Sequence, residues 1–184
     1  MQTTNFIIDQ KDLFKTTSET VEIAELTAGE VLFKIDKYAF TSNNVTYAVM
    51  GHRLKYWAFF PTAAPNGIVP VWGFADVVES KNEQVKVGER VYGYFPMSDY
   101  LIVQPGRINP FGFSDVVEHR KNLSPIYNFY ARLAADPSFN EETKDYIPII
   151  KPLFLMLSTN ANGKSCSFSS VRNIAALVCT SSKN

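Results

Sequence analysis

The sequence is poor in the residues on which metal, disulfide and nucleotide sites depend. It has two cysteines, two histidines and nine glycines in 184 residues. Cys166 and Cys179 allow one disulfide at most, and no Cys-x-x-Cys, His-x-x-x-His or His-Glu-x-x-His motif occurs, so a zinc or other metal site is not expected. Gly-x-Gly-x-x-Gly, Walker and Gly-x-Ser-x-Gly motifs are also missing, which excludes the common phosphate turns and the serine-hydrolase elbow.

The chain has no excess of either charge and no long apolar run. Its 18 basic residues balance its 18 acidic residues, so no basic field favours nucleic acid. The basic run His119–Lys121 lies beside Asp115 and Glu118 and is interpreted as a solvated turn, with phosphate binding as the alternative. The longest apolar stretch, residues 146–157, is interrupted by two prolines and a lysine and is too short for a membrane span. Charged residues at 9–12 replace the apolar core of a signal peptide, so we expect a cytoplasmic protein with reduced thiols and no membrane partner.

Aromatic residues make up 14% of the sequence, and many of them lie in segments typical of strands. Residues 30–38 alternate apolar and polar side chains, which predicts a strand. Further strands are predicted over residues 69–80, 85–95 and 100–103. Gly73 marks a place where a backbone must pass closely or a bulge must sit. Short strands with turn signals at this spacing favour a barrel or a sandwich, so the fold class is mainly β.

The second part of the sequence predicts two helices and an irregular tail. Ser124–Pro125 is a helix-start signal, and Asp136–Pro137 ends the helix that follows it. Ser138 starts a second helix, and residues 155–170 have no periodicity and are interpreted as loop or disorder. We therefore expect a barrel domain over residues 1–122, C-terminal linking helices over 123–158 and an irregular tail over 159–184.

A polar and aromatic segment after the first alternating strand is the best candidate for a site. Asn43 and Asn44 can hydrogen-bond a carbonyl or an amide, and Tyr47 can donate a proton or steady an oxyanion. The simpler interpretation is that the asparagines form a turn and that Tyr47 packs in the core. Three other aromatic residues are expected to be pocket wall or core rather than catalysts: Tyr56, Trp57 and Trp72.

The end of the chain offers a weaker candidate for cofactor binding. An apolar run over residues 174–179 precedes Ser181, Ser182 and Lys183. A strand that ends in small hydroxyl residues and a lysine can begin a phosphate turn. Serine-rich termini are also commonly frayed, and that alternative stays open.

Several linked motifs resemble the GroES-like barrel of the medium-chain dehydrogenase/reductases. Val87–Val91 reads Val-Gly-Glu-Arg-Val, which is similar to the Val-Gly-Asp-Arg-Val element of that superfamily. The likeness is closest to one branch, the domain-of-unknown-function family 2855, and covers roughly residues 20–154. The motifs that carry it are Asn43–Tyr47, Tyr56–Trp57, Phe59–Pro61, Pro70–Val78, Gly88–Pro96 and Tyr127–Asn128.

The resemblance implies a zinc-independent, NADP-dependent oxidoreductase acting on a carbonyl or an activated alkene. Zinc-bearing relatives have a cysteine where this sequence has Ser42–Asn44, and a histidine where it has Phe74. The implied catalytic residues are Asn43 and Asn44, which orient the substrate, and Tyr47, which donates a proton. The implied pocket walls are Tyr56, Trp57 and Trp72, and the implied cofactor-binding residues are Ser181, Ser182 and Lys183.

In such relatives a nucleotide-binding Rossmann domain follows the two helices, whereas this sequence ends at Asn184. The resemblance therefore implies truncation before that domain, after a possible first Rossmann strand in the tail. A natural truncation, a pseudogene product and a frame disturbance near residues 155–170 stay open. NADP is expected in full-length relatives, but this chain is not expected to bind it tightly or to turn over. The expected partner is a small-molecule substrate, and a homo-oligomer is allowed. The alternatives are a non-catalytic small-molecule-binding or protein-interaction module, and a chain that does nothing and is degraded.

Overall fold

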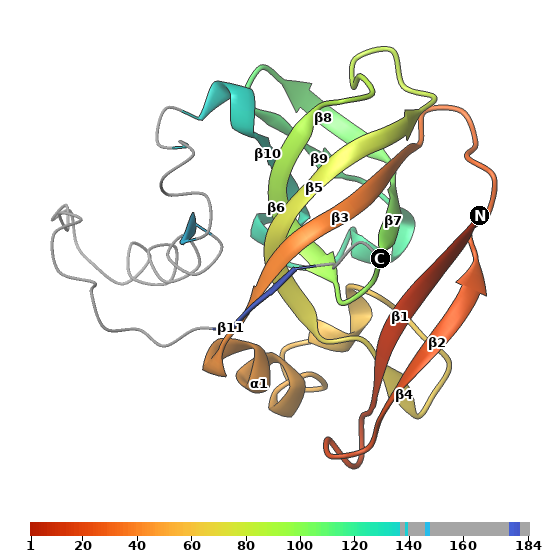
Figure 1. Ribbon diagram of the computed structural model, residues 1–184, viewed down its shortest axis with the longest axis vertical. Helices are drawn as coiled ribbons and strands as arrows, with labels where there is room; N and C mark the ends of the chain where they lie inside the picture. The colour runs from red at the N-terminus through yellow and green to blue at the C-terminus, as the bar shows by residue number, and fades with distance from the viewer. Residues whose placement is uncertain (137–138, 140–145, 148–176, 181–184) are drawn as a thin grey trace, which may run out of the picture.

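The protein is a curled β-sheet structure in the computed structural model, which describes residues 1–136, 139, 146–147 and 177–180 (Figure 1). The prediction of a mainly β fold is confirmed. The strands are β1 (Gln2–Asp9), β2 (Thr16–Glu22), β3 (Val31–Phe40), β4 (Asn66–Gly67), β5 (Pro70–Ser80), β6 (Arg90–Pro96), β7 (Tyr100–Val103), β8 (Pro105–Asn109), β9 (Gly112–Asp115), β10 (Phe129–Arg132) and β11 (Leu177–Thr180). The helix α1 (Ser42–Val49) and the 3₁₀ helices η1 (Tyr56–Ala58), η2 (Glu118–Arg120), η3 (Pro125–Asn128) and η4 (Leu133–Ala135) lie between them.

The larger sheet forms a circuit of antiparallel pairs. Its strands follow the order β11-β3-β5-β6-β10-β9-β8, and β7 also pairs with β3. Only Gln104 separates β7 from β8. Because β7 pairs with β3 and β8 pairs with β9, this continuous segment connects the two ends of the sheet. The sheet is thereby curled into a barrel around an apolar interior.

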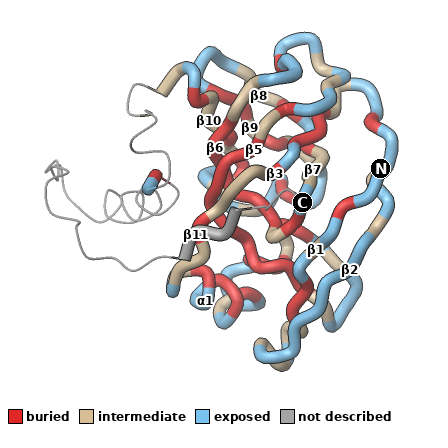
Figure 2. Tube along the Cα trace, in the orientation of Figure 1, coloured by how far each residue is buried: buried red, intermediate tan, exposed pale blue. Residues whose placement is uncertain are grey.

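Strands β5 and β6 are buried on both faces, and they form the red centre of Figure 2. Successive side chains of a strand point to opposite faces, so each strand contributes to two clusters. One set joins the barrel interior and consists of Val71, Ala75, Val91 and Phe95. The other set lies at the centre of an aromatic cluster outside the barrel and consists of Trp72, Phe74, Tyr92 and Tyr94.

Gly73 lies where β3 and β5 approach closely, as the sequence predicts. The register between these strands shifts between Ile35 and Lys37, which marks a bulge in β3. A Cβ atom on Gly73 would lie 2.7 Å from Cβ of Tyr38 and closer still to the backbone of Lys37. A side chain at this position would therefore force the two strands apart.

The helix predicted from Ser124 to Asp136 is wrong. This segment forms η3, the strand β10 and η4. Strand β10 pairs with both β6 and β9, which places the Tyr130 side chain in the barrel interior. Tertiary pairing outweighs the helical spacing of the apolar residues here, because aromatic residues fit a strand that is buried between two neighbours. The second predicted helix lies almost entirely outside the described residues.

A smaller sheet with the order β2-β1-β4 lies beside the barrel (Figure 1). The backbone N–H of Phe6 donates to the carbonyl of Met97 at 2.8 Å, and Asn5 forms a β-bridge with Ser98. These contacts join β1 to the segment that leads into β7. At the other end of the chain, β11 pairs antiparallel with residues 37–40 of β3. The terminal strand is thus part of the barrel sheet, and no parallel Rossmann sheet occurs among the residues that the structure describes.

Candidate functional site

The predicted polar segment after β3 is the helix α1 rather than a loop. Thr41 precedes the helix, and its side-chain oxygen accepts a hydrogen bond from the backbone N–H of Asn43 at 3.3 Å. The side-chain oxygen of Asn44 accepts from the backbone N–H of Thr41 at 2.7 Å, which completes a capping box. The side-chain NH₂ of Asn44 donates to the carbonyl of Pro70 at 2.8 Å. Asn44 is buried and fastens α1 to β5, so both ends of its amide are already used.

Asn43 and Tyr47 lie four residues apart on α1 and therefore share one face of the helix. The side-chain NH₂ of Asn43 donates to the hydroxyl oxygen of Tyr47 at 2.8 Å. The indole N–H of Trp72 donates to the same oxygen at 3.3 Å. Tyr47 is only 1% exposed, whereas Asn43 is half-buried. The structure thus brings together three predicted site residues: Asn43, Tyr47 and Trp72.

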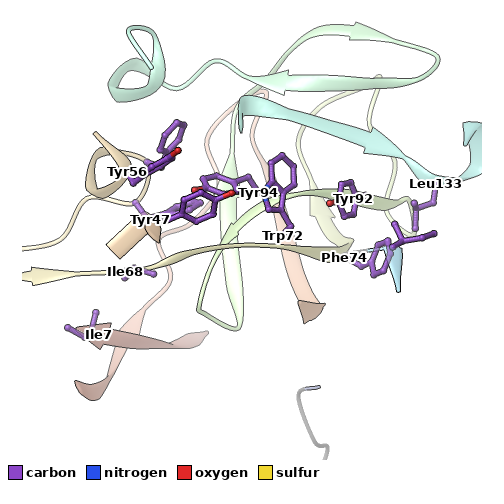
Figure 3. Close-up of a cluster of buried hydrophobic side chains, with 12 residues drawn as sticks. Ile7, Tyr47, Tyr56, Ile68, Trp72, Phe74, Tyr92, Tyr94 and Leu133 are labelled. Carbon is purple, nitrogen blue, oxygen red and sulfur yellow. Dashed lines mark hydrogen bonds between the residues drawn. The ribbon is translucent and has the colours of Figure 1, made fainter. Parts of the chain in front are cut away.

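Other aromatic rings lie around Tyr47 (Figure 3). The ring of Tyr47 lies 4.5 Å from that of Tyr56 and 5.6 Å from that of Tyr94, between centroids. Tyr127 packs against Tyr94 at 4.6 Å, and its hydroxyl lies 3.2 Å from that of Tyr56. The hydroxyl of Tyr94 is buried and has no hydrogen-bond partner among the described residues. This arrangement gathers several phenol groups beside α1, and we call it the tyrosine cluster: Tyr47, Tyr56, Tyr92, Tyr94 and Tyr127.

Sequence reasoning did not single out Tyr92, Tyr94 or Tyr127 as site residues. The sequence does contain a signal for Tyr92 and Tyr94. They lie two residues apart in β6, so their side chains must share one face of the sheet. Trp72 of β5 lies on the same face of the sheet, because Trp72 and Tyr94 are register partners and their ring centroids are 5.0 Å apart. Tyr127 comes from η3, and nothing in its local pattern indicates that it reaches the cluster.

Burial is the main cause of the shifted pKa values in this part of the molecule. It raises the pKa of Tyr47, although the hydrogen bonds from Trp72 and Asn43 act in the opposite direction. Burial also raises the pKa of Tyr92 and Tyr94 well above the ordinary tyrosine value, and it raises that of Tyr127. These groups are therefore neutral hydrogen-bond donors at neutral pH.

We predict that the protein loses stability at alkaline pH. The raised pKa values mean that the folded state keeps protons that the unfolded state releases above about pH 10. This contribution is complete below that pH and is lost as the pH rises further. Burial raises the pKa of Tyr130 to about 12, and Tyr127 ionises at still higher pH. The phenolate absorbance of these buried tyrosines and circular dichroism should therefore change together in an alkaline transition. Ionisation of all the tyrosines near their ordinary pKa with the fold intact would contradict this prediction.

Trp57 does not belong to the tyrosine cluster. It packs with Ile8, Ala48 and Val69 in a separate group, and its ring lies over Gly51 and Gly67. The structure therefore separates Trp57 from Tyr56 and Trp72, with which it was predicted to line a pocket. The predicted cofactor residues Ser181, Ser182 and Lys183 lie outside the described residues.

Arg120 was missed by sequence reasoning, and the interpretation of its segment as a solvated turn is wrong at this position. Its side chain is 1% exposed and forms an ion pair with Asp115 at 3.4 Å, whose side chain is 2% exposed. A run of three basic residues gives no sign that one of them turns inward. Across the described part of the chain, no three His, Cys, Asp or Glu side chains gather as a metal site would require.

These observations define the class of structure: the protein is a mainly β barrel with a cluster of tyrosines outside it. The family model described as "Protein of unknown function (DUF2855)" matches residues 38–160, which is more than half of the chain. The chain belongs to this family. The match agrees with the family indicated by the sequence motifs.

Several solved structures resemble part of this chain. CurA from Vibrio vulnificus is 16% identical with a TM-score of 0.42, and the match covers 56% of this chain and 31% of that protein. The mitochondrial 2-enoyl thioester reductase Etr1p/Etr2p heterodimer from Candida tropicalis is 14% identical with a TM-score of 0.48, covering 88% of this chain and 44% of that protein. The chain thus spans less than half the length of each. No curated protein matches the sequence, and no helix in the described residues is long and apolar enough to cross a membrane.

Proposed function

We propose that the barrel is the substrate-binding part of a zinc-independent, NADP-dependent oxidoreductase that acts on a carbonyl or an activated alkene. The observation that carries this proposal is the hydrogen bonding of the Tyr47 hydroxyl. Asn43 and Trp72 both donate to its oxygen, so the phenol hydrogen points to neither of them. No acceptor for that hydrogen is found in the described part of the chain. Tyr47 is therefore arranged to donate a proton to a bound substrate.

The same two donors support the second half of the step. When Tyr47 gives its proton to the substrate, its oxygen becomes a phenolate. The N–H groups of Asn43 and Trp72 already point at that oxygen and would stabilise the charge without rearrangement. Asn43 and Tyr127 are only half-buried, so a substrate would reach the hydroxyl past these two side chains. The amide oxygen of Asn43 has no hydrogen-bond donor among the described residues, so it is available to orient the substrate.

NADPH would supply the hydride in such a reaction. A dinucleotide binds at the carboxyl ends of parallel strands, next to a glycine-rich turn. The named strands of the structure pair antiparallel, and the serines and lysine proposed for the phosphate turn are outside the described residues. The described residues therefore do not fit the cofactor by themselves, and we derive no hydride step. We propose that the 184-residue chain alone does not convert substrate to product.

The test is the binding of cyclohex-2-enone, an activated alkene, followed by tryptophan fluorescence. Tyr47→Phe removes only the hydroxyl group and is expected to weaken binding about 3–10-fold, as loss of one hydrogen bond does. Tyr146→Phe, at an exposed position outside the tyrosine cluster, is the matched control and should bind like the wild type. Equal binding by wild type and Tyr47→Phe, or no binding by the wild type, would remove the support for a proton donor at this position.

A non-catalytic small-molecule-binding module is the second candidate. The observation in its favour is the lack of a dinucleotide crevice among the described residues. Calorimetric titration of the same chain with NADPH separates the two functions. We expect no measurable heat from the chain alone. Micromolar binding would mean that the chain forms a nucleotide site, and would overturn the proposal that it cannot turn over without a further domain.

A further inference from the structure

A cleft of about 300 Å³ lies away from the Tyr47 hydroxyl, where the small sheet meets the barrel. Its walls come from β1, from β7 and from the segment that leads through η2. Figure 1 shows β1 and β7 on the same side of the molecule. None of the residues to which a catalytic or pocket role is assigned above lines this cleft. Its volume is at the lower end of the range for small-molecule sites in proteins.

Much of the cleft lining is apolar. Its apolar residues include Phe60, Ile68, Pro96, Leu101, Ile102 and Val117. Rings and branched side chains of this kind bind hydrocarbon by excluding water and offer no hydrogen bonds to the ligand. Selectivity must therefore come from the polar groups of the lining.

Arg120 supplies a buried polar group in the lining. Its Nε donates to the carbonyl of Phe59 at 3.3 Å, and its Nη1 donates to the hydroxyl of Tyr130 at 3.3 Å and faces Asp115. Its guanidinium also lies over the ring of Phe60, with 4.7 Å from Cζ to the ring centroid. Nη2 makes no hydrogen bond within the part of the chain that the structure describes, although Arg120 is almost fully buried and lines the cleft. A fixed, buried donor is thus left for a ligand.

Asn5 supplies a second donor in the lining. The hydroxyl of Ser98 lies 2.9 Å from that of Thr3 and donates to the side-chain oxygen of Asn5 at 2.6 Å. These contacts fix the orientation of the Asn5 amide and leave its NH₂ group without a hydrogen-bond partner in the described residues. All three side chains line the cleft. The lining therefore offers a ligand two N–H donors, one from Arg120 and one from Asn5.

We propose that this cleft binds a neutral small molecule with an apolar body and hydrogen-bond acceptors, such as a ketone or an ester. Neutrality follows from the charges. Arg120 is the one lysine or arginine among the described residues of the lining and already pairs with Asp115, while Glu22 pairs with the N-terminal ammonium at 3.6 Å, so an anion would find no unpaired lysine or arginine there. The site is separate from the Tyr47 hydroxyl and does not depend on the oxidoreductase proposal.

The test uses the full 184-residue chain and three ligands of similar size, followed by nuclear magnetic resonance. 4-Methoxyacetophenone is neutral with an acceptor at each end, 4-ethylanisole lacks the carbonyl, and 4-methoxybenzoate is an anion. We expect 4-methoxyacetophenone to shift the Nε–H signal of Arg120 and the side-chain amide signals of Asn5. 4-Ethylanisole and 4-methoxybenzoate should bind about tenfold more weakly, because the first lacks the carbonyl acceptor and the second carries a charge that the lining leaves unpaired.

A variant that blocks the cleft tests where the ligand binds and leaves the buried Asp115–Arg120 ion pair unchanged. Ala24 is exposed at the rim of the cleft, so Ala24→Phe should fill the opening and weaken 4-methoxyacetophenone binding about tenfold or more. Ala28→Phe adds the same side chain at an exposed position outside the lining and should bind like the wild type. The proposal is overturned if the ketone gives no shift, if Ala24→Phe binds it unchanged, or if the benzoate binds as well as the ketone.

Discussion

Replacing Asp115 with alanine is expected to lower the free energy of unfolding by about 3–5 kcal/mol. The reason is the burial of its partner. Arg120 would keep its charge in a place where its side chain is 1% exposed, with no carboxylate nearby to offset the cost of desolvation. The backbone N–H groups of Gln104 and Val117, which donate to the carboxylate at 3.0 and 3.2 Å, would also lose their acceptor. Urea unfolding followed by circular dichroism measures the effect.

Two further variants separate charge from hydrogen bonding in this experiment. Asp115→Asn keeps an acceptor oxygen for the backbone N–H groups but removes the charge, so it should fall between the wild type and Asp115→Ala. Glu118→Ala breaks the exposed pair with Lys121 and is expected to cost less than about 1 kcal/mol, since solvent screens such pairs. If Asp115→Ala costs no more than Glu118→Ala, the buried pair does not hold the barrel and η2 together.

The barrel could be predicted because its strands show the expected alternation of apolar and polar residues and have glycine or turn residues at the expected places. Residues 30–38 alternate as a half-buried strand must, and Gly73 marks the close approach that the bulge of β3 produces. The two-sided burial of β5 and β6 is also consistent with their nearly continuous apolar sequence. These features are local, and a local pattern is what a sequence displays directly.

The helix α1 could have been recognised from its first residues. Thr41 and Asn44 have the spacing of a capping box, in which the third helical residue usually is Glu or Gln. Asparagine at that position is more typical of a turn, so a turn was the simpler interpretation of this segment. The consequence for the site is specific: Asn44 serves the helix start, whereas the amide oxygen of Asn43 has no partner in the part of the chain that the structure describes.

Neighbours across the fold were harder to predict than the elements. Tyr56 and Trp57 are adjacent in sequence, yet one joins the tyrosine cluster and the other packs over Gly51 and Gly67. The direction of each side chain is set by the path of η1, which no periodicity encodes. The inward turn of Arg120 has the same origin, because its partners Asp115 and Tyr130 lie on two different strands. Contacts of this kind depend on strand order.

Replacing Tyr130 with alanine is expected to lower the free energy of unfolding by about 3–5 kcal/mol, the range for large aromatic residues in a core. The ring is fully buried inside the barrel, with centroids 5.1 Å from Phe33 and 5.3 Å from Phe95. Gly93 on β6 leaves space for it, since a Cβ atom there would lie 2.7 Å from Cε1 of the Tyr130 ring. Truncation would leave a cavity that the closed circuit of strands cannot readily collapse.

Tyr130→Phe separates the ring from the hydroxyl in the same unfolding measurement. The hydroxyl donates to the carbonyl of Tyr94 at 3.1 Å and accepts from Nη1 of Arg120, so its removal should cost about 1–3 kcal/mol through unsatisfied buried groups. Tyr146→Ala, at a position that is 60% exposed, should change stability by less than about 0.5 kcal/mol. The expected order is therefore Tyr130→Ala, then Tyr130→Phe, then Tyr146→Ala. If Tyr130→Ala and Tyr130→Phe prove equally costly, ring packing in the barrel is not what stabilises it, and the pairing of β10 with β6 and β9 must instead depend on the hydroxyl and Arg120.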